Sequence, residues 1–424
     1  MHKKWYSLID KIYCKKNLKA SFKRVRANKG SAGIDGITVA EFEEKESENL
    51  EELHMELKTN RYEPLPVKRV YIDKGNGKKR PLGIPSVRDR VVQQALKNVL
   101  EPIFEPDFHP SSYGYRPNKS CHKAVAKAEM FINKYGLEYV VDMDLSKCFD
   151  TLDHDMILDG VWNKVSDGRV LDLIRKILKS GVMEGLKYDP TEIGSPQGGV
   201  ISPLLMNIYL DKFDQELKSQ RIRIVRYADD ILIFANSKSK AVRNLKEARK
   251  ILEEDLKLKI NEEKTHLCHI SEGVKYLGFV IYQRYVAIQK GKVELFKEKV
   301  KRLTKRNQGL NLERVIKRLN MTLRGWLNYY RIANIKGLLK ELMCWIRRRL
   351  RMKKMKEWKY WKGLHKELRR RGYRGEFEKI SVTRWRNSSS PLIHMALPNT
   401  WFDYKGLYNM ERVEVGILHN YYEI

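Results

Sequence analysis

Short runs of apolar residues, several of them alternating with polar ones, predict strands in the first 290 residues. The run at 67–72 alternates with period two, and a partner strand is predicted at 79–84. Gly75-Asn76-Gly77 lies between them and is typical of a tight hairpin turn. Further strands are predicted at 139–144, 222–227, 231–235, 274–282 and 285–289.

Apolar residues at helical spacing alternate with these strands. The first sixty residues are predicted to be mostly helical, interrupted by the glycine-rich segment 28–36. Other helices are expected at 88–100, from about 145, over much of 156–181, from Pro203, and at 240–256. Because helices and strands are mixed without a regular βαβ repeat, the pattern favours the α+β class.

Strand signals stop after residue 290, and three successive segments then carry apolar residues on one helical face. Leu312, Val315, Leu319, Leu323 and Trp326 form the longest of these faces. The pattern predicts a first region at 1–290, a helical domain at 291–375 and a short C-terminal segment at 376–424.

The charge of the chain is unevenly distributed. The 424 residues carry a net charge of +31. Between Lys290 and Gly375 there are 29 Lys and Arg against six Glu and no Asp, a net of +23. A solvated basic surface is one interpretation, but aromatic residues are interleaved with the charges, which favours a module that binds a polyanion.

Cysteine usage and hydropathy exclude several classes of protein. The five cysteines are scattered and include no Cys-x-x-Cys, which argues against a disulfide framework and a structural zinc site. Cys268 lies between His266 and His269, but three residues so close in sequence rarely complete a tetrahedral site. No apolar run is long enough to span a bilayer, and the first residues do not form a signal peptide. A cytoplasmic protein without a membrane partner is expected.

Two adjacent acids, Asp229 and Asp230, separate the predicted strands 222–227 and 231–235. Acids in a surface turn would be unremarkable, since Asp is a common turn residue. However, a third acid, Asp144, ends another apolar strand. If these strands are neighbours, the three carboxylates form a cluster that suits two Mg²⁺ ions, and such a pair of ions serves phosphoryl transfer.

A set of motifs in order resembles the reverse transcriptases encoded by group II introns. Tyr227-Ala228-Asp229-Asp230 is similar to the signature of reverse transcriptases in general. The other similar segments are Arg80–Pro85, Ser112–Pro117, Val141–Asp150, Gly194–Leu205, Asn261–Lys264 and Tyr276–Phe279. The resemblance implies a right-hand polymerase, with fingers and an RRM-like palm sheet followed by an α-helical thumb. It also implies that Asp144, Asp229 and Asp230 are the catalytic metal ligands.

The same resemblance implies roles for five residues near the nucleotide. Lys74 and Arg80 would reach the triphosphate, although hairpin charges are commonly just solvated. Phe149 would exclude a ribose 2′-hydroxyl, with core packing as its alternative. Gln197 would line the nucleotide pocket, and Lys264 would donate a proton to pyrophosphate; either side chain could instead be only a surface group.

The basic helical region resembles the thumb of this family, called the maturase or X domain. The similar segments are Trp326–Arg331 and Trp345–Arg351. Arg347, Arg348, Arg349 and Arg351 are expected to contact RNA phosphates from one helix face. Trp358 and Trp361 could stack on bases or pack in the core. Residues 376–424 hold no Cys and His set typical of the family's endonuclease, so an endonuclease-lacking type with at most a reduced DNA-binding region is expected.

The resemblance as a whole implies an RNA-directed DNA polymerase that also assists splicing and mobility of a group II intron. The implied partners are group II intron RNA, an RNA template with a DNA primer, deoxynucleotides and a DNA target. A retron-like or other bacterial reverse transcriptase is the alternative enzyme, but the form of Gln197–Pro203 and the long basic thumb argue against it. A splicing factor without chemistry is the second alternative, and it need not keep the three acids.

Overall fold

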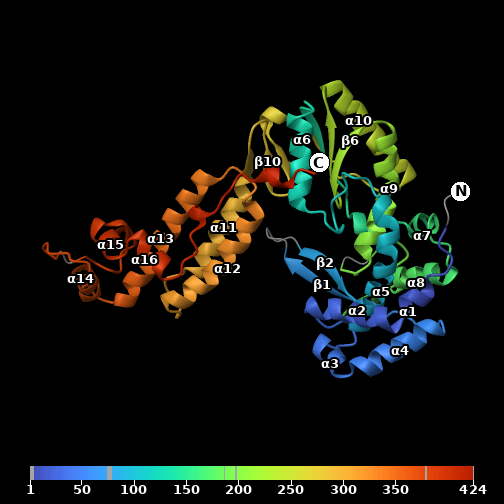
Figure 1. Ribbon diagram of the computed structural model, residues 1–424, viewed down its shortest axis with the longest axis horizontal. Coiled ribbons are helices and arrows are strands. Elements are labelled where there is room, and N and C mark those ends of the chain that lie inside the picture. The colour runs from blue at the N-terminus through green and yellow to red at the C-terminus, as the bar shows by residue number, and fades with distance from the viewer. Residues whose placement is uncertain (1–3, 74–78, 186, 196–197, 378–379, 424) are drawn as a thin grey trace. The chain divides into compact units, whose positions relative to one another are not determined.

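The computed structural model describes residues 4–73, 79–185, 187–195, 198–377 and 380–423 (Figure 1). The chain folds as two compact units, Met1–His269 and Ile270–Ile424. The predicted boundary after residue 290 falls instead at the start of a helix inside the second unit. The division into three domains, including a separate segment at 376–424, remains a prediction.

Helices form the N-terminal part of the first unit, as the sequence predicted. They are α1 (Ile9–Tyr13), α2 (Lys15–Ala27), α3 (Val39–Glu44), α4 (Glu46–Lys58) and α5 (Val87–Phe104). Thr38 begins α3 with a capping box, in which its hydroxyl accepts from the Glu41 amide and the Glu41 carboxylate accepts from the Thr38 amide. The long helix α5 is buried along much of its length and packs against α1, α2 and α4.

A first sheet follows the order β2-β1-β4-β5. Strands β1 (Val67–Asp73) and β2 (Lys79–Ile84) pair antiparallel where the sequence predicted a hairpin, although its turn lies outside the described residues. Strands β4 (Val182–Glu184) and β5 (Lys187–Asp189) were not predicted. Strands of three residues are too short to show a periodic pattern.

The central sheet holds the predicted acid-bearing strands. Its order is β6 (Arg223–Tyr227), β7 (Asp230–Ala235), β3 (Tyr139–Asp144) and β8 (His266–His269), all antiparallel. Helix α6 (Cys121–Asn133) packs against β6, α10 (Lys238–Lys250) packs against β7, and α9 (Ser202–Ser219) packs against β6. Strand β7 is buried from Ile231 to Ala235, which explains its continuous apolar sequence.

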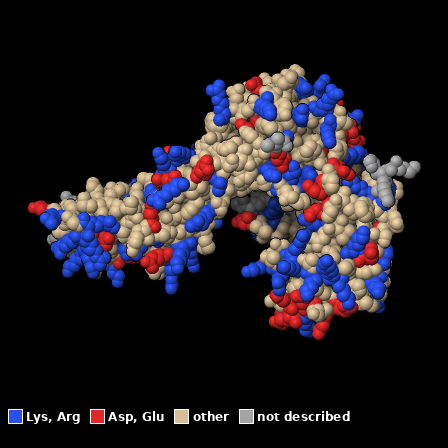
Figure 2. Space-filling view, in the orientation of Figure 1, with Lys and Arg blue, Asp and Glu red and all other residues tan. Residues whose placement is uncertain are grey.

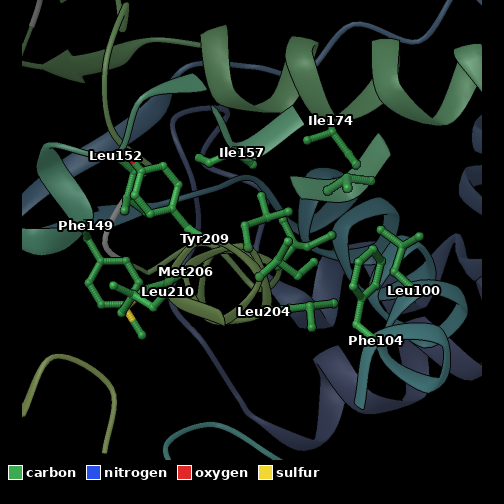
Figure 3. Close-up of a cluster of buried hydrophobic side chains, with 14 of the residues drawn as sticks. Leu100, Phe104, Phe149, Leu152, Ile157, Ile174, Leu204, Met206, Tyr209 and Leu210 are labelled. Atoms are coloured by element: carbon green, nitrogen blue, oxygen red, sulfur yellow. The ribbon is translucent and has the colours of Figure 1, made fainter. Parts of the chain in front are cut away.

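The core of the first unit lies among α5, α7 (His154–Trp162), α8 (Gly168–Lys179) and α9. Figure 3 shows side chains of these helices meeting in this cluster: Leu100, Phe104, Ile157, Ile174, Leu204, Met206, Tyr209 and Leu210. Two residues that precede α7, Phe149 and Leu152, extend the cluster toward the end of β3.

The helix predicted from about residue 145 is wrong. Only one 3-10 turn, Cys148–Asp150, forms there, preceded by Lys147 in the left-handed region at φ 50°. Neighbouring segments take up the backbone groups instead: the Ser146 amide donates to the Lys259 carbonyl at 2.8 Å, and the Phe149 carbonyl accepts from the Ser195 amide at 2.7 Å. Tertiary hydrogen bonds therefore replace the helical ones.

The second unit combines a small sheet with helices. Strands β9 (Val274–Tyr276), β10 (Phe279–Ile281) and β11 (Val286–Ile288) pair antiparallel. The single strand predicted at 274–282 is thus two, because Leu277 and Gly278 turn the chain with positive φ. The helices are α11 (Lys290–Leu303), α12 (Leu312–Tyr330), α13 (Lys336–Trp358), α14 (Trp361–Arg370), α15 (Pro391–Ala396) and α16 (Asn399–Tyr404).

Candidate active site

The acids at the ends of β3 and β7 lie directly opposite each other. Asp144 pairs with Asp230 in the antiparallel register of these two strands. Asp229 lies in the two-residue turn that joins β6 to β7, where Ala228 takes a left-handed conformation at φ 59°. The expectation that the acid-bearing strands are neighbours is confirmed, and one edge of the sheet carries all three carboxylates.

The electrostatics of this edge reflect crowded negative charge. Burial first, and then the charges of Asp229, Asp144 and Asp142, raise the pKa of Asp230 to about 7, against an opposing effect of Lys264. Lys264 Nζ lies 2.6 Å from Asp144 Oδ2, and the Asn261 amide donates to the same oxygen at 3.1 Å. The ammonium of Lys264 therefore offsets part of the repulsion among the acids.

The donor chemistry of this edge fits a hard divalent cation. Carboxylate oxygens are the ligands that Mg²⁺ prefers, and a cation would relieve the repulsion that raises the Asp230 pKa. In the part of the chain that the structure describes, no three acidic, His or Cys side chains converge closely enough to hold an ion. In this arrangement Lys264 occupies one of the two carboxylate oxygens of Asp144.

Replacing Asp230 by Asn is expected to stabilise the metal-free protein at neutral and higher pH. With a pKa near 7 in place of 3.8, the folded state binds more protons than the unfolded state between these values, so stability falls as pH rises through this window. The substitution should therefore raise the free energy of unfolding by roughly 2 to 4 kcal/mol at about pH 8, and by less at about pH 5. Urea denaturation in EDTA at both pH values measures the difference. A variant no more stable than wild type at the higher pH would contradict the proposed crowding.

The predicted nucleotide-binding residues are only partly described. Lys74 and Gln197 lie outside the described residues. Arg80 is exposed on β2, and its charge lowers the pKa of Tyr115, which burial and then Asp229 raise overall. The charges of Arg80 and of the acids thus influence the pKa of the same residue, Tyr115, in opposite directions. Lys264 contacts the Asp144 carboxylate, and its role as a proton donor remains a prediction.

Phe149 lies between the hydrophobic core and the acid-bearing edge. It is 7% exposed, belongs to the core cluster (Figure 3), and meets the half-exposed Tyr115 ring edge-on at 6.5 Å. The Gly194–Ser195 segment is bonded to Phe149 and to residues that follow it: the Ser195 amide donates to the Phe149 carbonyl at 2.7 Å, the Gly194 amide donates to the Leu152 carbonyl at 2.8 Å, and His154 Nε2 bonds the Gly194 carbonyl at 2.6 Å. Core packing and a role at the sugar are both compatible with this position.

Replacing Phe149 by Ala is expected to raise the use of ribonucleotides relative to deoxynucleotides, by about tenfold or more, because the ring would no longer exclude a 2′-hydroxyl. The loss of core packing costs roughly 3–5 kcal/mol of stability. A ratio of the two incorporation rates, taken within one preparation, cancels that loss. Phe104→Ala, a core change on α5, is the matched control and should leave the ratio unchanged. An unchanged ratio in an active Phe149→Ala protein would make Phe149 a packing residue only.

Sequence reasoning missed the side chains that hold the turn between β6 and β7. Arg226 is fully buried and forms an ion pair with Asp214 of α9, which is also fully buried. The only sequence signal was a charged residue within an apolar strand, next to the acids. Its ion-pair partner, twelve residues earlier, is on a helix that gave no such signal.

Two of the four predicted RNA-binding arginines do not face solvent, so that prediction is wrong for them. Arg347 is 4% exposed and donates to the Glu411 carboxylate at 2.7 Å. Arg351 is 1% exposed and donates to the Leu397 carbonyl and the Asn399 side chain. Leu397, Asn399 and Glu411 contact this helix face, and they belong to a segment for which no clear shape was predicted.

The other two arginines are half-buried. Arg349 donates to the Thr304 hydroxyl, and the guanidinium groups of Arg348 and Arg349 lie over the Trp385 ring. Trp358 is half-buried against Gly363, while Trp361 contacts the His365 ring at a tilted angle, with centroids 4.7 Å apart, and stays 36% exposed. Packing therefore accounts for Trp358, and Trp361 keeps an accessible ring.

Other cations of the second unit are exposed. Figure 2 shows Lys and Arg side chains crowded over this part of the chain. On α12 the exposed basic residues are Arg314, Lys317, Arg318 and Arg324. On α14 they are Lys362, Lys366, Arg369 and Arg370. These two helices, more than the middle of α13, present the excess positive charge to solvent.

Comparisons with known proteins place the chain in the reverse transcriptase class. A family model described as reverse transcriptase (RNA-dependent DNA polymerase) matches residues 72–281, and one described as group II intron, maturase-specific domain, matches residues 293–372. The chain belongs to the family of reverse transcriptases and maturases encoded by group II introns. The predicted resemblance and fold class are thereby confirmed.

Known proteins similar to this chain match it over different shares of its length and of their own. Protein YkfC of Escherichia coli is 37% identical over 58% of this chain and 74% of its own length. The group II intron-encoded protein LtrA of Lactococcus lactis is 30% identical over 62% of this chain, which spans 54% of LtrA. Among solved structures, a telomerase from Candida albicans matches with a TM-score of 0.43 and 12% identity, over 74% of this chain and 63% of that one. No described helix is both long and apolar enough to cross a membrane.

Proposed function

We propose that this protein is an RNA-directed DNA polymerase that extends a DNA primer on an RNA template and also binds group II intron RNA to assist splicing. The single observation that carries the polymerase is the pairing of Asp144 with Asp230 across two strands, with Asp229 in the adjoining turn. The maturase-specific match at residues 293–372 supports the second role.

The three carboxylates would hold two Mg²⁺ ions, which supply Lewis acidity for the attacking 3′-hydroxyl and the leaving pyrophosphate. The chain's own groups then orient the substrate. The Arg80 guanidinium would attract the triphosphate, and the Phe149 and Tyr115 rings would lie beside the sugar. Lys264, which contacts Asp144 beside the acids, would donate a proton to pyrophosphate.

Primer extension tests the polymerase. The purified protein should extend a DNA primer on an RNA template with deoxynucleotides and Mg²⁺, and EDTA should stop it. Absence of extension under both low and moderate salt would refute the polymerase proposal.

A splicing assay tests the maturase. The RNA that flanks the gene serves as substrate, and the protein should accelerate its splicing at near-physiological salt. Extension without any acceleration would favour the alternative of a bacterial reverse transcriptase with no splicing role. Acceleration without extension would favour a splicing factor that has lost its chemistry.

A further inference from the structure

The turn that carries Asp229 is hydrogen-bonded to a buried polar side chain of the preceding strand, β6. Arg226, two residues before Ala228, is fully buried in β6. Its Nε lies 2.9 and 3.0 Å from the two carboxylate oxygens of Asp214 on α9, and its Nη2 also donates to Asp214. The guanidinium thus joins the strand to the helix by a bidentate ion pair.

The remaining nitrogen of Arg226 reaches the turn itself. Nη1 donates to the Ala228 carbonyl at 3.1 Å and to Asn207 Oδ1 at 3.1 Å. The Ala228 carbonyl belongs to the peptide group that links Ala228 to Asp229. A hydrogen bond to this oxygen fixes the plane of that peptide, and with it the direction in which Asp229 leaves the turn.

Asn207 also holds the turn from its other side. Its amide donates to the Gly114 carbonyl at 2.9 Å. The Ser111–Gly114 segment runs beside β6, where Arg226 exchanges backbone hydrogen bonds with Ser111 and Tyr113 at 2.9 and 2.8 Å. Gly114 lies so close to the turn that a Cβ there would be 2.3 Å from the Ala228 nitrogen. The turn is therefore enclosed between Gly114 and Arg226, and Asn207 bonds both.

Stability alone does not account for this arrangement. Burial lowers the pKa of Arg226, but attraction and hydrogen bonding to Asp214 outweigh it, and the net pKa is raised, so the group stays charged. Apolar residues of similar volume often replace a buried ion pair at no loss of stability. An apolar replacement would not, however, donate to the Ala228 carbonyl.

We infer that Arg226 and Asn207 are positioning residues, which hold the peptide between Ala228 and Asp229 and so fix the position of Asp229 relative to Asp144. This inference rests on the proposed polymerase function, since it concerns the geometry of the same carboxylates. Neither side chain needs to touch the nucleotide, because both act through the backbone of the turn.

Two variants test the inference in the full-length protein. Gly114→Ala adds a methyl group against the Ala228 nitrogen and removes no polar atom. Asn207→Leu removes both hydrogen bonds of Asn207 and leaves the ion pair of Arg226 with Asp214. Tyr209→Phe is the matched control, because it removes the hydrogen bonds of a hydroxyl on the same helix, to the Leu256 carbonyl and the Met156 sulfur.

The expected result is a split between kcat and KM. At saturating Mg²⁺, both variants should lower kcat for primer extension by about tenfold or more, with KM for deoxynucleotide changed less than about twofold, since misplaced acids affect the reacting atoms more than nucleotide binding. Tyr209→Phe should keep kcat near the wild-type value at a similar melting temperature. A kcat near wild type in folded Gly114→Ala or Asn207→Leu protein would overturn the inference, as would an equal loss of kcat in Tyr209→Phe.

A measurement of metal binding distinguishes a failure of this inference from a failure of the proposed polymerase function. Mn²⁺ bound to the protein without nucleic acid, measured by electron paramagnetic resonance, should be weaker in Gly114→Ala than in wild type. If wild type does not extend a primer, the polymerase proposal fails, yet weaker Mn²⁺ binding in the variant would still support the positioning role. Equal Mn²⁺ affinity in wild type and Gly114→Ala would overturn that role, whether or not wild type extends a primer.

Discussion

Asp229→Asn is expected to abolish primer extension, by at least about a thousandfold, while the protein stays folded and binds RNA. Asparagine keeps the size of the side chain but loses the charge that a metal ligand needs. Asp229 lies in a turn whose backbone is fixed by Arg226 and Gly114, so the substitution should not disturb β6 or β7. Asp144→Asn on the facing strand should have the same effect.

Single-turnover extension on a saturating primer and RNA template measures this loss. Asp159→Asn is the matched control: Asp159 is an exposed acid on α7, away from the acid-bearing edge, and its variant should extend at the wild-type rate. Extension by Asp229→Asn at the wild-type rate would remove Asp229 from the active site.

Arg351→Ala is expected to destabilise the second unit by roughly 1–3 kcal/mol, instead of acting on RNA binding alone. Burial lowers the pKa of Arg351 to about 10, so the group is still charged at neutral pH. It donates to the Leu397 carbonyl and to the Asn399 side chain, and its guanidinium lies over the Phe402 ring. Truncation would leave a cavity and an unpaired carbonyl where α13 meets the C-terminal segment.

The exposed cations of α12 provide the contrast. Neutralising Arg314, Lys317, Arg318 and Arg324 should weaken RNA binding and reduce its dependence on salt, by roughly one unit of log–log slope per lost phosphate contact. Stability should hardly change, because surface charges contribute little to it. Thermal melts and RNA titrations at several salt concentrations, run on both sets of variants, compare the effects. A stable Arg351→Ala protein with a flattened salt slope would restore the original assignment of Arg351 to the RNA surface.

Three strands of the central sheet, β3, β6 and β7, could be predicted from the sequence, because each is a largely apolar run next to an acid, whereas β8 was not predicted. The predicted limits of β2 and β3 are those of the structure, and the pairing of Asp144 with Asp230 follows once the strands are neighbours. What the sequence could not show is which strands are neighbours. That order depends on crossovers between distant segments, and here β3 pairs with β7 and β8.

The failures have a common physical origin in long-range contacts. The segment after β3 has helical spacing, yet its backbone bonds to residues near 195 and 259. Arg347 and Arg351 were placed on a free basic face because their neighbours in sequence are also basic. Their partners, Glu411 and Leu397, lie 64 and 46 residues away, in a segment without a readable pattern.

The small sheet of the second unit is hydrogen-bonded to the helices that follow it, and this affects where a chimaera of two related proteins should be joined. Asn334, just before α13, exchanges hydrogen bonds with Val286 of β11 at 2.8 and 2.9 Å, and the Tyr329 hydroxyl of α12 donates to the Leu277 carbonyl at 2.9 Å. A chimaera joined between the two matched family regions, near residue 290, would therefore pair strands of one parent with helices of another. A junction near residue 270 would transfer strands and helices together, so the exchanged piece would bring its own packing partners.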